Sequence, residues 1–133
     1  MRVGALALVI GAVLAGCGLS VQSPDLFLLT RTGQGRTLTL LVSDSGTIRC
    51  NGGPPKSLPN QLLLQARGVA SDLGKDAKAK LRIPAGPGSV ARYTIRLQGG
   101  TISFPDTAAS GRHELAGAEL FATQSEQGPC AAR

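Results

Sequence analysis

Aromatic and imidazole side chains are scarce in this chain. Its 133 residues contain no tryptophan, one tyrosine, three phenylalanines and a single histidine, His113. The hydrophobic core must therefore come mainly from Leu, Ile, Val and Ala. A single imidazole, in a chain without any Cys-x-x-Cys spacing, gives little support for a zinc site. We expect no metal site, and we expect His113 to lie on the surface.

Catalytic and cofactor-binding motifs are also missing. The sequence has no Gly-x-Ser-x-Gly elbow and no Ser-x-x-Lys pair, two arrangements that carry a serine nucleophile. The glycine-rich segments at 33–36 and 86–89 lack the fixed spacing of phosphate-binding loops. No acidic cluster matches a calcium loop. We therefore predict no catalytic residues, no cofactor and no enzymatic activity.

Positive charge is present but is not concentrated. Without Arg2, thirteen of the 14 Lys and Arg residues remain, against 8 Asp and Glu residues. They are spread from Arg31 to Arg133, with no dense run and no interleaved aromatic residues that could stack bases. Nucleic-acid binding is therefore not expected. A basic balance favours anionic lipid headgroups or acidic wall polymers as partners, and it is equally typical of an ordinary solvated surface.

The N-terminal segment carries no charge between Arg2 and Asp25. Its apolar run at residues 3–15 is shorter than the roughly 20 residues that a transmembrane helix needs. A short basic start, an apolar run and small residues are typical of a secretory signal. The run ends in Leu14-Ala15-Gly16-Cys17, which resembles the lipobox of bacterial lipoproteins. The alternatives are an ordinary signal peptide with an incidental cysteine, or a short membrane anchor.

The lipobox resemblance implies a division of the chain. Residues 1–16 would be a signal peptide, residues 17–24 a lipidated N-terminus and tether, and residues 25–133 a single extracytoplasmic domain. The resemblance also implies a diacylglyceryl thioether on Cys17 and often an amide-linked acyl chain such as palmitate. Two or more acyl chains anchor a protein stably. The expected location is the extracytoplasmic face of the cell membrane, with the membrane as a partner through this lipid.

Once Cys17 is assigned to lipid, Cys50 and Cys130 are left as one pair. In an exported protein such a pair predicts a disulfide. The bond would close a loop of about 80 residues, for which chain-entropy arithmetic gives at most roughly 4.5 kcal/mol of stabilisation. A metal-binding or catalytic thiol is the alternative.

Alternating apolar residues and turn signals predict short antiparallel strands. The segments concerned are 25–31, 37–43, 47–50, 92–97 and 102–104. Residues 92–97 alternate most clearly, with Tyr93 and Ile95 on one face and Arg92 and Arg96 on the other. The glycine pair before Thr101 is expected to form the turn of a hairpin.

One segment between the strands has helical spacing. Leu62, Ala66 and Leu73 recur at intervals of three and four residues, which predicts a helix over 60–73, with an extension to residue 78 as the alternative. Ser57 and Asn60 are the candidate N-cap residues.

The fold class that follows is α+β. We expect a small antiparallel sheet of four to five strands with one main helix packed on one face. Residues 113–123 fit either a second, short C-terminal helix or a final strand, and the spacing does not decide between them.

Two features could form a binding surface. Arg92 and Arg96 make an arginine stripe, and arginine contacts carboxylates or phosphates with two hydrogen bonds. The proline-containing segment at 81–90 could dock into a partner as a rigid loop. The alternatives are ordinary solvent-facing alternation and a plain helix-to-strand connection.

The order of elements resembles that of the subtilisin-inhibitor-like family of secreted proteins. Three segments carry the resemblance, namely Leu28-Leu29-Thr30 before a glycine turn, Thr47-Ile48-Arg49-Cys50-Asn51-Gly52, and Tyr93-Thr94-Ile95-Arg96-Leu97 near Gly99-Gly100. That family presents a reactive loop between its helix and hairpin, clamped by disulfides. The resemblance would place Lys80, Arg82 and Ile83 in such a loop, yet residues 80–88 contain no cysteine to clamp it.

The leading hypothesis is a non-enzymatic lipoprotein domain that binds a partner or has a structural role at the cell envelope. An envelope protein and an anionic wall or lipid polymer are the candidate partners. The alternative function is inhibition of an extracellular serine protease.

Overall fold

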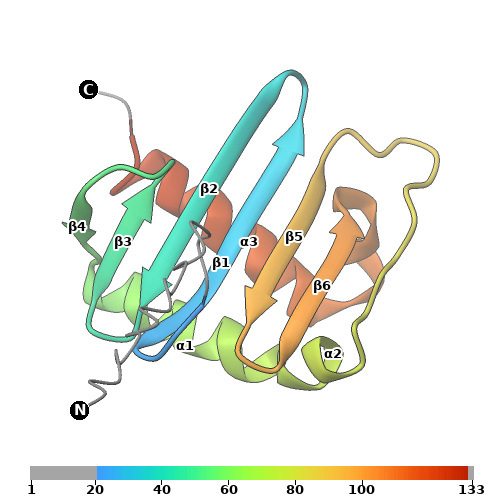
Figure 1. Cartoon of the computed structure of the whole chain (residues 1–133). Coiled ribbons are helices and arrows are strands. Elements are labelled where there is room, and N and C mark those ends of the chain that lie inside the picture. The colour runs from blue at the N-terminus through green and yellow to red at the C-terminus, as the bar shows by residue number, and fades with distance from the viewer. Residues whose placement is uncertain (1–20, 132–133) are drawn as a thin grey trace, which may run out of the picture.

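A computed structural model describes residues 21–131, which form a single six-stranded antiparallel sheet with helices on one side (Figure 1). Cys17 and the predicted signal peptide lie outside the described residues. The strand order is β4-β3-β2-β1-β5-β6. The strands are β1 (Asp25–Gly33), β2 (Arg36–Ser43), β3 (Thr47–Cys50), β4 (Pro55–Ser57), β5 (Arg92–Leu97) and β6 (Gly100–Pro105).

The alternation of the sequence decides which face of the sheet is buried. Leu29 of β1 lies opposite Leu40 of β2 and Ile95 of β5, so that large apolar side chains from three strands share one face. All three are fully buried. Because side chains in a strand alternate with period two, Thr30 and Arg96 belong to the other face.

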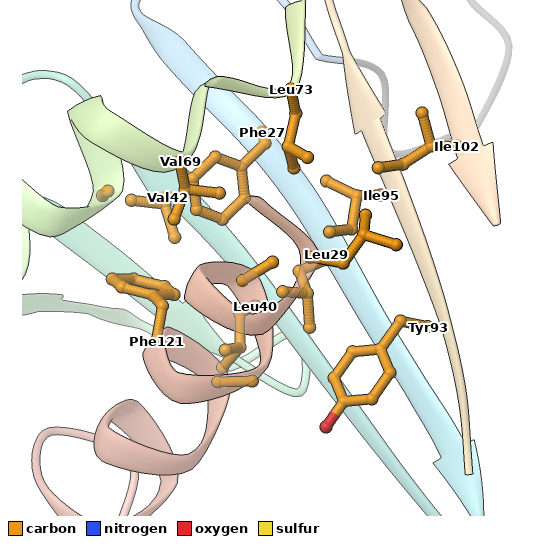
Figure 2. Close-up of a cluster of buried hydrophobic side chains, with 14 of the residues drawn as sticks. Phe27, Leu29, Leu40, Val42, Val69, Leu73, Tyr93, Ile95, Ile102 and Phe121 are labelled. Atoms are coloured by element: carbon orange, nitrogen blue, oxygen red, sulfur yellow. The ribbon is translucent and has the colours of Figure 1, made fainter. Parts of the chain in front are cut away.

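The helices cover the apolar face. They are α1 (Asn60–Asp72), the short α2 (Gly74–Lys78) and α3 (His113–Gln127), and a 3₁₀ helix, η1 (Asp106–Gly111), precedes α3. Figure 1 shows α1 and α3 behind the sheet. Val69 of α1 and Phe121 of α3 enter the core, where Phe121 meets Phe27 edge to face with ring centroids 5.5 Å apart (Figure 2). None of the helices within residues 21–131 has both the length and the apolar character that crossing a membrane requires.

The predicted α+β class is confirmed, with one more strand than expected. The additional strand is β4, which pairs with β3 through Ile48 and Lys56. Its three residues are exposed at the edge of the sheet, where a proline is tolerated because its missing N–H is not needed for pairing. The segment around Pro54 and Pro55 thus ends the run of strands from β1 to β3 and also supplies the short edge strand β4.

The helical predictions need one correction. The predicted helix at 60–73 is present as α1, and its extension forms α2. Neither Ser57 nor Asn60 caps it, because Ser57 belongs to β4 and Asn60 is already helical; Pro59 occupies the N-cap position without a side-chain hydrogen bond. Residues 113–123 are helical, and α3 continues to Gln127.

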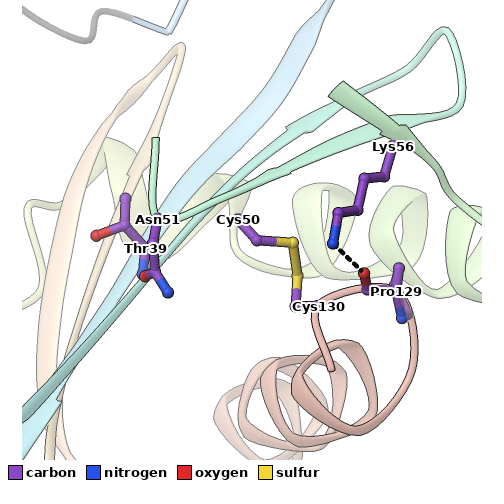
Figure 3. Close-up of a disulfide and its surroundings, with 6 residues drawn as sticks. All are labelled: Thr39, Cys50, Asn51, Lys56, Pro129 and Cys130. Carbon is purple, nitrogen blue, oxygen red and sulfur yellow. Dashed lines mark hydrogen bonds between the residues drawn. A yellow bond between two sulfur atoms is a disulfide. The ribbon is translucent and has the colours of Figure 1, made fainter. Parts of the chain in front are cut away.

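The predicted Cys50–Cys130 disulfide is present, with the two Cα atoms 5.7 Å apart. It joins the end of β3 to the segment after α3 (Figure 3). Lys56 Nζ donates a hydrogen bond of 3.2 Å to the carbonyl oxygen of Pro129 close by. The disulfide therefore fixes the C-terminal end of α3 against the sheet.

Because Gly100 has no side chain, α2 can pack directly against the turn between β5 and β6. Gly100 has a φ of +152°, and a Cβ there would stand 2.1 Å from the carbonyl oxygen of Ala77 in α2. Ala77 is fully buried. Only glycine permits this close approach of two backbone segments.

We predict that Gly100→Ala lowers the free energy of unfolding by about 2 kcal/mol or more, because α2 must move away from the turn. Urea unfolding followed by circular dichroism measures the change. Gly68→Ala in α1 is the matched control, because a Cβ there meets nothing within 4 Å. That change should stabilise the helix by about 0.5–1 kcal/mol. A Gly100→Ala protein as stable as the wild type would contradict the packing described.

Candidate functional site

A cleft of about 850 Å³ opens at one end of the domain. It lies between the β1–β2 hairpin, the residues just before β5 and the C-terminal end of α3. The hairpin extends past its neighbour β3 here, because β2 begins at Arg36 but pairs with β3 only from Leu40 to Ser43. Figure 1 shows the hairpin projecting past the other strands.

One wall of the cleft carries an ion pair between elements far apart in sequence. Arg31 of β1 donates a hydrogen bond to Glu126 of α3 and forms a salt bridge with it. Burial lowers the pKa of Arg31, but the hydrogen bond and charge of Glu126 outweigh it and raise that pKa overall. The guanidinium of Arg31 therefore stays charged and holds the end of α3 to the hairpin.

The floor of the cleft is built around Tyr93. Its ring is stacked on Phe104 with centroids 5.3 Å apart and planes 7° apart. Burial, followed by the charge of Glu119, raises the pKa of the Tyr93 hydroxyl. In Figure 2 this hydroxyl points away from the apolar cluster. The ring of Tyr93 therefore belongs to the core, and the residue is only 5% exposed.

Glu119 is a half-buried residue of α3 outside the cleft lining, and its charge reaches Tyr93. Burial, followed by the charge of Asp106, raises its pKa from 4.5 to about 7. Its Oε1 is buried without a hydrogen-bond partner among the described residues. Perturbed titratable groups beside a cleft are typical of functional sites.

The lining of the cleft contains charges of both signs and many neutral polar groups. Arg31 and Arg36 face Asp106 and Glu126, and Asn51, Thr37 and Thr123 add amide and hydroxyl groups. The volume lies in the range of about 300–1,000 Å³ that is usual for small-molecule sites. Within residues 21–131, no group of three or more His, Cys, Asp or Glu side chains is placed to hold a metal ion. The lining thus offers hydrogen-bond donors, hydrogen-bond acceptors and charges of both signs.

The predicted arginine stripe is divided between two environments. Arg92 and Arg96 lie on the same face of β5, as the alternation predicts. Arg92 is half-buried, and its Nη2 donates a hydrogen bond of 3.0 Å to the carbonyl oxygen of Ile83. Arg96 is exposed on the side of the sheet opposite the helices. Arg92 therefore positions a loop, and only Arg96 presents its side chain at the surface.

The three loop candidates lie along the edge of β6. Lys80 is exposed directly after α2 and has a φ of +53°. Arg82 is exposed and forms an isolated parallel bridge with Ser103, while Ile83 is half-buried and donates its N–H to the carbonyl oxygen of Ser103 at 2.9 Å. The structure thus brings Arg82, Ile83 and Arg92 together, at a distance along the sheet from Arg96. His113 is on the surface, as predicted, with a side chain 96% exposed.

The cleft residues were not predicted as a site. Arg31 and Glu126 are 95 positions apart, and only the packing of α3 against the hairpin brings them together. One signal was available: in a helix from residue 113, Leu115, Glu119, Ala122 and Glu126 recur at three- and four-residue spacing. That spacing places two carboxylates on the apolar side of the helix, where an unpaired charge is costly.

No protein-family model, no curated protein and no solved structure matches this chain. The assignment of a role to the cleft therefore rests on its own geometry and on the N-terminal sequence.

We predict that Glu119→Gln stabilises the protein, and that the gain is clearly larger at pH 8 than at pH 5. The pKa of Glu119 is higher in the folded state, about 7 against 4.5, so ionisation opposes folding and stability falls as the pH rises between these values. A glutamine has the shape of the protonated acid and removes this loss. Urea unfolding at both pH values measures it. An equal change in stability at pH 5 and pH 8 would contradict the assignment.

Proposed function

We propose that the chain is a lipid-anchored, extracytoplasmic binding module that holds a small polar ligand in the cleft between the β1–β2 hairpin and α3. Three things support this. The lipobox at Leu14-Ala15-Gly16-Cys17 favours an anchor at the N-terminus. The sequence lacks the motifs of an enzyme. The described domain has a cleft of about 850 Å³ with charged and neutral polar walls.

The observation that carries the proposal is the position of the cleft relative to the tether. The tether enters the domain at Asp25, the first residue of β1, and the cleft is lined by Arg31 and Gly33 at the other end of the same strand. Nine extended residues span about 30 Å. A lipid at Cys17 would therefore allow the cleft to lie as much as about 30 Å further from the membrane than Asp25.

The cleft chemistry favours a ligand with both charged and neutral polar groups. Arg31 is already paired with Glu126, and Asp106 accepts a hydrogen bond of 3.2 Å from the N–H of Val90. Arg36 is the cation of the lining that is left to meet a carboxylate or phosphate. Thr37 and Thr123, which are exposed in the same lining, add neutral hydroxyl groups.

The test uses soluble fragments of a lysozyme digest of bacterial cell wall as the probe. Ligand-observed NMR with the purified mature protein should detect binding of at least one fragment. Thr123→Trp fills the cleft from an exposed position of its wall and should weaken that binding at least tenfold. Ala116→Trp, on the same side of α3 two turns earlier, is exposed outside the cleft and should not. Equal binding to both variants would contradict the cleft as the site.

A second candidate function, inhibition of an extracellular serine protease, is favoured by the way the 81–90 segment is held. Ser103 N–H donates to the carbonyl oxygen of Leu81 at 3.0 Å, and Arg92 donates to that of Ile83. At the other end, Val90 N–H donates to Asp106. Hydrogen bonds therefore fix both ends of an exposed loop that has no disulfide clamp.

If the loop is inhibitory, the protein should block trypsin or subtilisin at a one-to-one ratio while the loop stays intact. Residual protease activity and mass spectrometry of the mixture measure both. Arg82→Ala should then abolish inhibition of trypsin, because trypsin selects a basic side chain. Rapid cleavage between Lys80 and Ala85 without loss of protease activity would exclude this function.

A further inference from the structure

The short helix α2 lies directly beside the point where the tether enters the domain. A second recess, of about 340 Å³, is lined by Pro24 and Leu26 on one side and by Ala77 and Lys78 of α2 on the other. Gly100 holds α2 in this place through its close approach to Ala77. The tether and α2 therefore share one end of the domain, opposite the cleft.

The lysines of the chain are gathered at this end. The chain has four lysines, and three of them, Lys75, Lys78 and Lys80, fall within six residues, while the fourth is Lys56 in β4. The side chains of all three residues are exposed. Lysine combines a flexible apolar stem with a compact charge, which suits contact with a layer of headgroups.

The acidic groups around α2 offset part of the charge of these lysines. Asp44 is paired with Arg67 at 2.6 Å, and Asp76 lies 3.8 Å from Arg112, which lies equally far from Glu114. Asp72 is exposed and offsets one lysine charge. The recess itself is lined by Asp25 and Asp44, so it does not suit an anion. The surplus positive charge belongs to the exposed side of α2.

The length of the tether limits how far α2 can be from a membrane. Four peptide units separate Cys17 from Val21, the first described residue. At no more than about 3.6 Å each, they reach at most about 14 Å. At physiological salt, an anionic bilayer attracts a lysine side chain strongly only within the Debye screening length of about 8 Å. An anchor on Cys17 therefore keeps Val21 within less than two screening lengths of the bilayer surface.

We propose that α2 is a membrane-contact element, in which Lys75, Lys78 and Lys80 bind the anionic phospholipid headgroups of the bilayer that holds the Cys17 lipid. This inference rests on the proposed lipid anchor. Each lysine at an anionic surface strengthens the contact about fivefold. The contact orients the domain, so that β1 stands away from the membrane and the cleft faces outward.

The test is lysine footprinting of the mature, lipidated protein on vesicles. A water-soluble acetylating reagent modifies exposed amines, and mass spectrometry gives the rate at each lysine. On vesicles with 30% phosphatidylglycerol, we expect Lys75, Lys78 and Lys80 to react at least threefold more slowly, relative to Lys56, than on pure phosphatidylcholine. The protection should disappear in 1 M salt, where screening shortens to about 3 Å. Equal rates on the two kinds of vesicle would overturn the proposal.

Matched variants separate a specific contact from the general basic charge. In the double variant Lys75→Gln, Lys80→Gln, the acetylation rate of Lys78 still reports on the contact. We expect most of the protection of Lys78 to be lost, because removing two lysines weakens the contact equilibrium about 25-fold. Arg49→Gln with Arg96→Gln removes the same charge from exposed positions outside both the cleft and α2 and should leave Lys78 protected. Loss of protection in both variants would show attraction by net charge alone and would overturn the assignment to α2.

Two different results would contradict the proposed lipid anchor and the proposed α2 contact. A protein without lipid on Cys17 would not float with pure phosphatidylcholine vesicles, and the proposed function would then be wrong. A protein that floats with both kinds of vesicle but shows no protection of Lys78 would retain the anchor and lose only the α2 contact.

Discussion

The Cys50–Cys130 disulfide is the constraint on which both the core and the cleft depend. It fixes the end of α3 to β3, and α3 supplies Leu115, Ala118, Phe121 and Ala122 to a core that contains no tryptophan. A domain of about 100 residues buries a smaller share of its surface than a large one, so a covalent bond across it matters more. The same bond places Glu126 where it can pair with Arg31 and close one wall of the cleft.

The two ends of the domain have different chemistry. At the hairpin end, longer strands leave a cleft whose charges come from β1, β2, η1 and α3. At the opposite end, Gly100 brings α2 against the β5–β6 turn beside Pro24, where the tether enters. Such a division suits a domain held at one end and used at the other. Fold alone does not determine function, and the proposal rests on what these two ends contain.

Local sequence patterns were sufficient for most of the fold. Alternation in residues such as Tyr93 and Ile95 predicted the strands, because one face of the sheet is buried and the other is not. The strand at Pro55 was missed because a three-residue edge strand carries no alternation to detect. The cleft was missed for a different reason. Its charged residues come from separate elements, and the weak signal at Glu119 becomes meaningful only when α3 is known to pack against the sheet.

The central claim is that this is a disulfide-bonded domain tethered by lipid on Cys17, and the intact mass of the protein extracted from its native membrane tests it most directly. The account predicts a mass that begins at Cys17, includes acyl chains, and rises by one pair of hydrogens on reduction. An unmodified mass would show that Cys17 is a thiol without lipid. The domain would then have no lipid tether, and the inferred outward orientation of the cleft would lose its basis. A mass that does not change on reduction would contradict the Cys50–Cys130 bond.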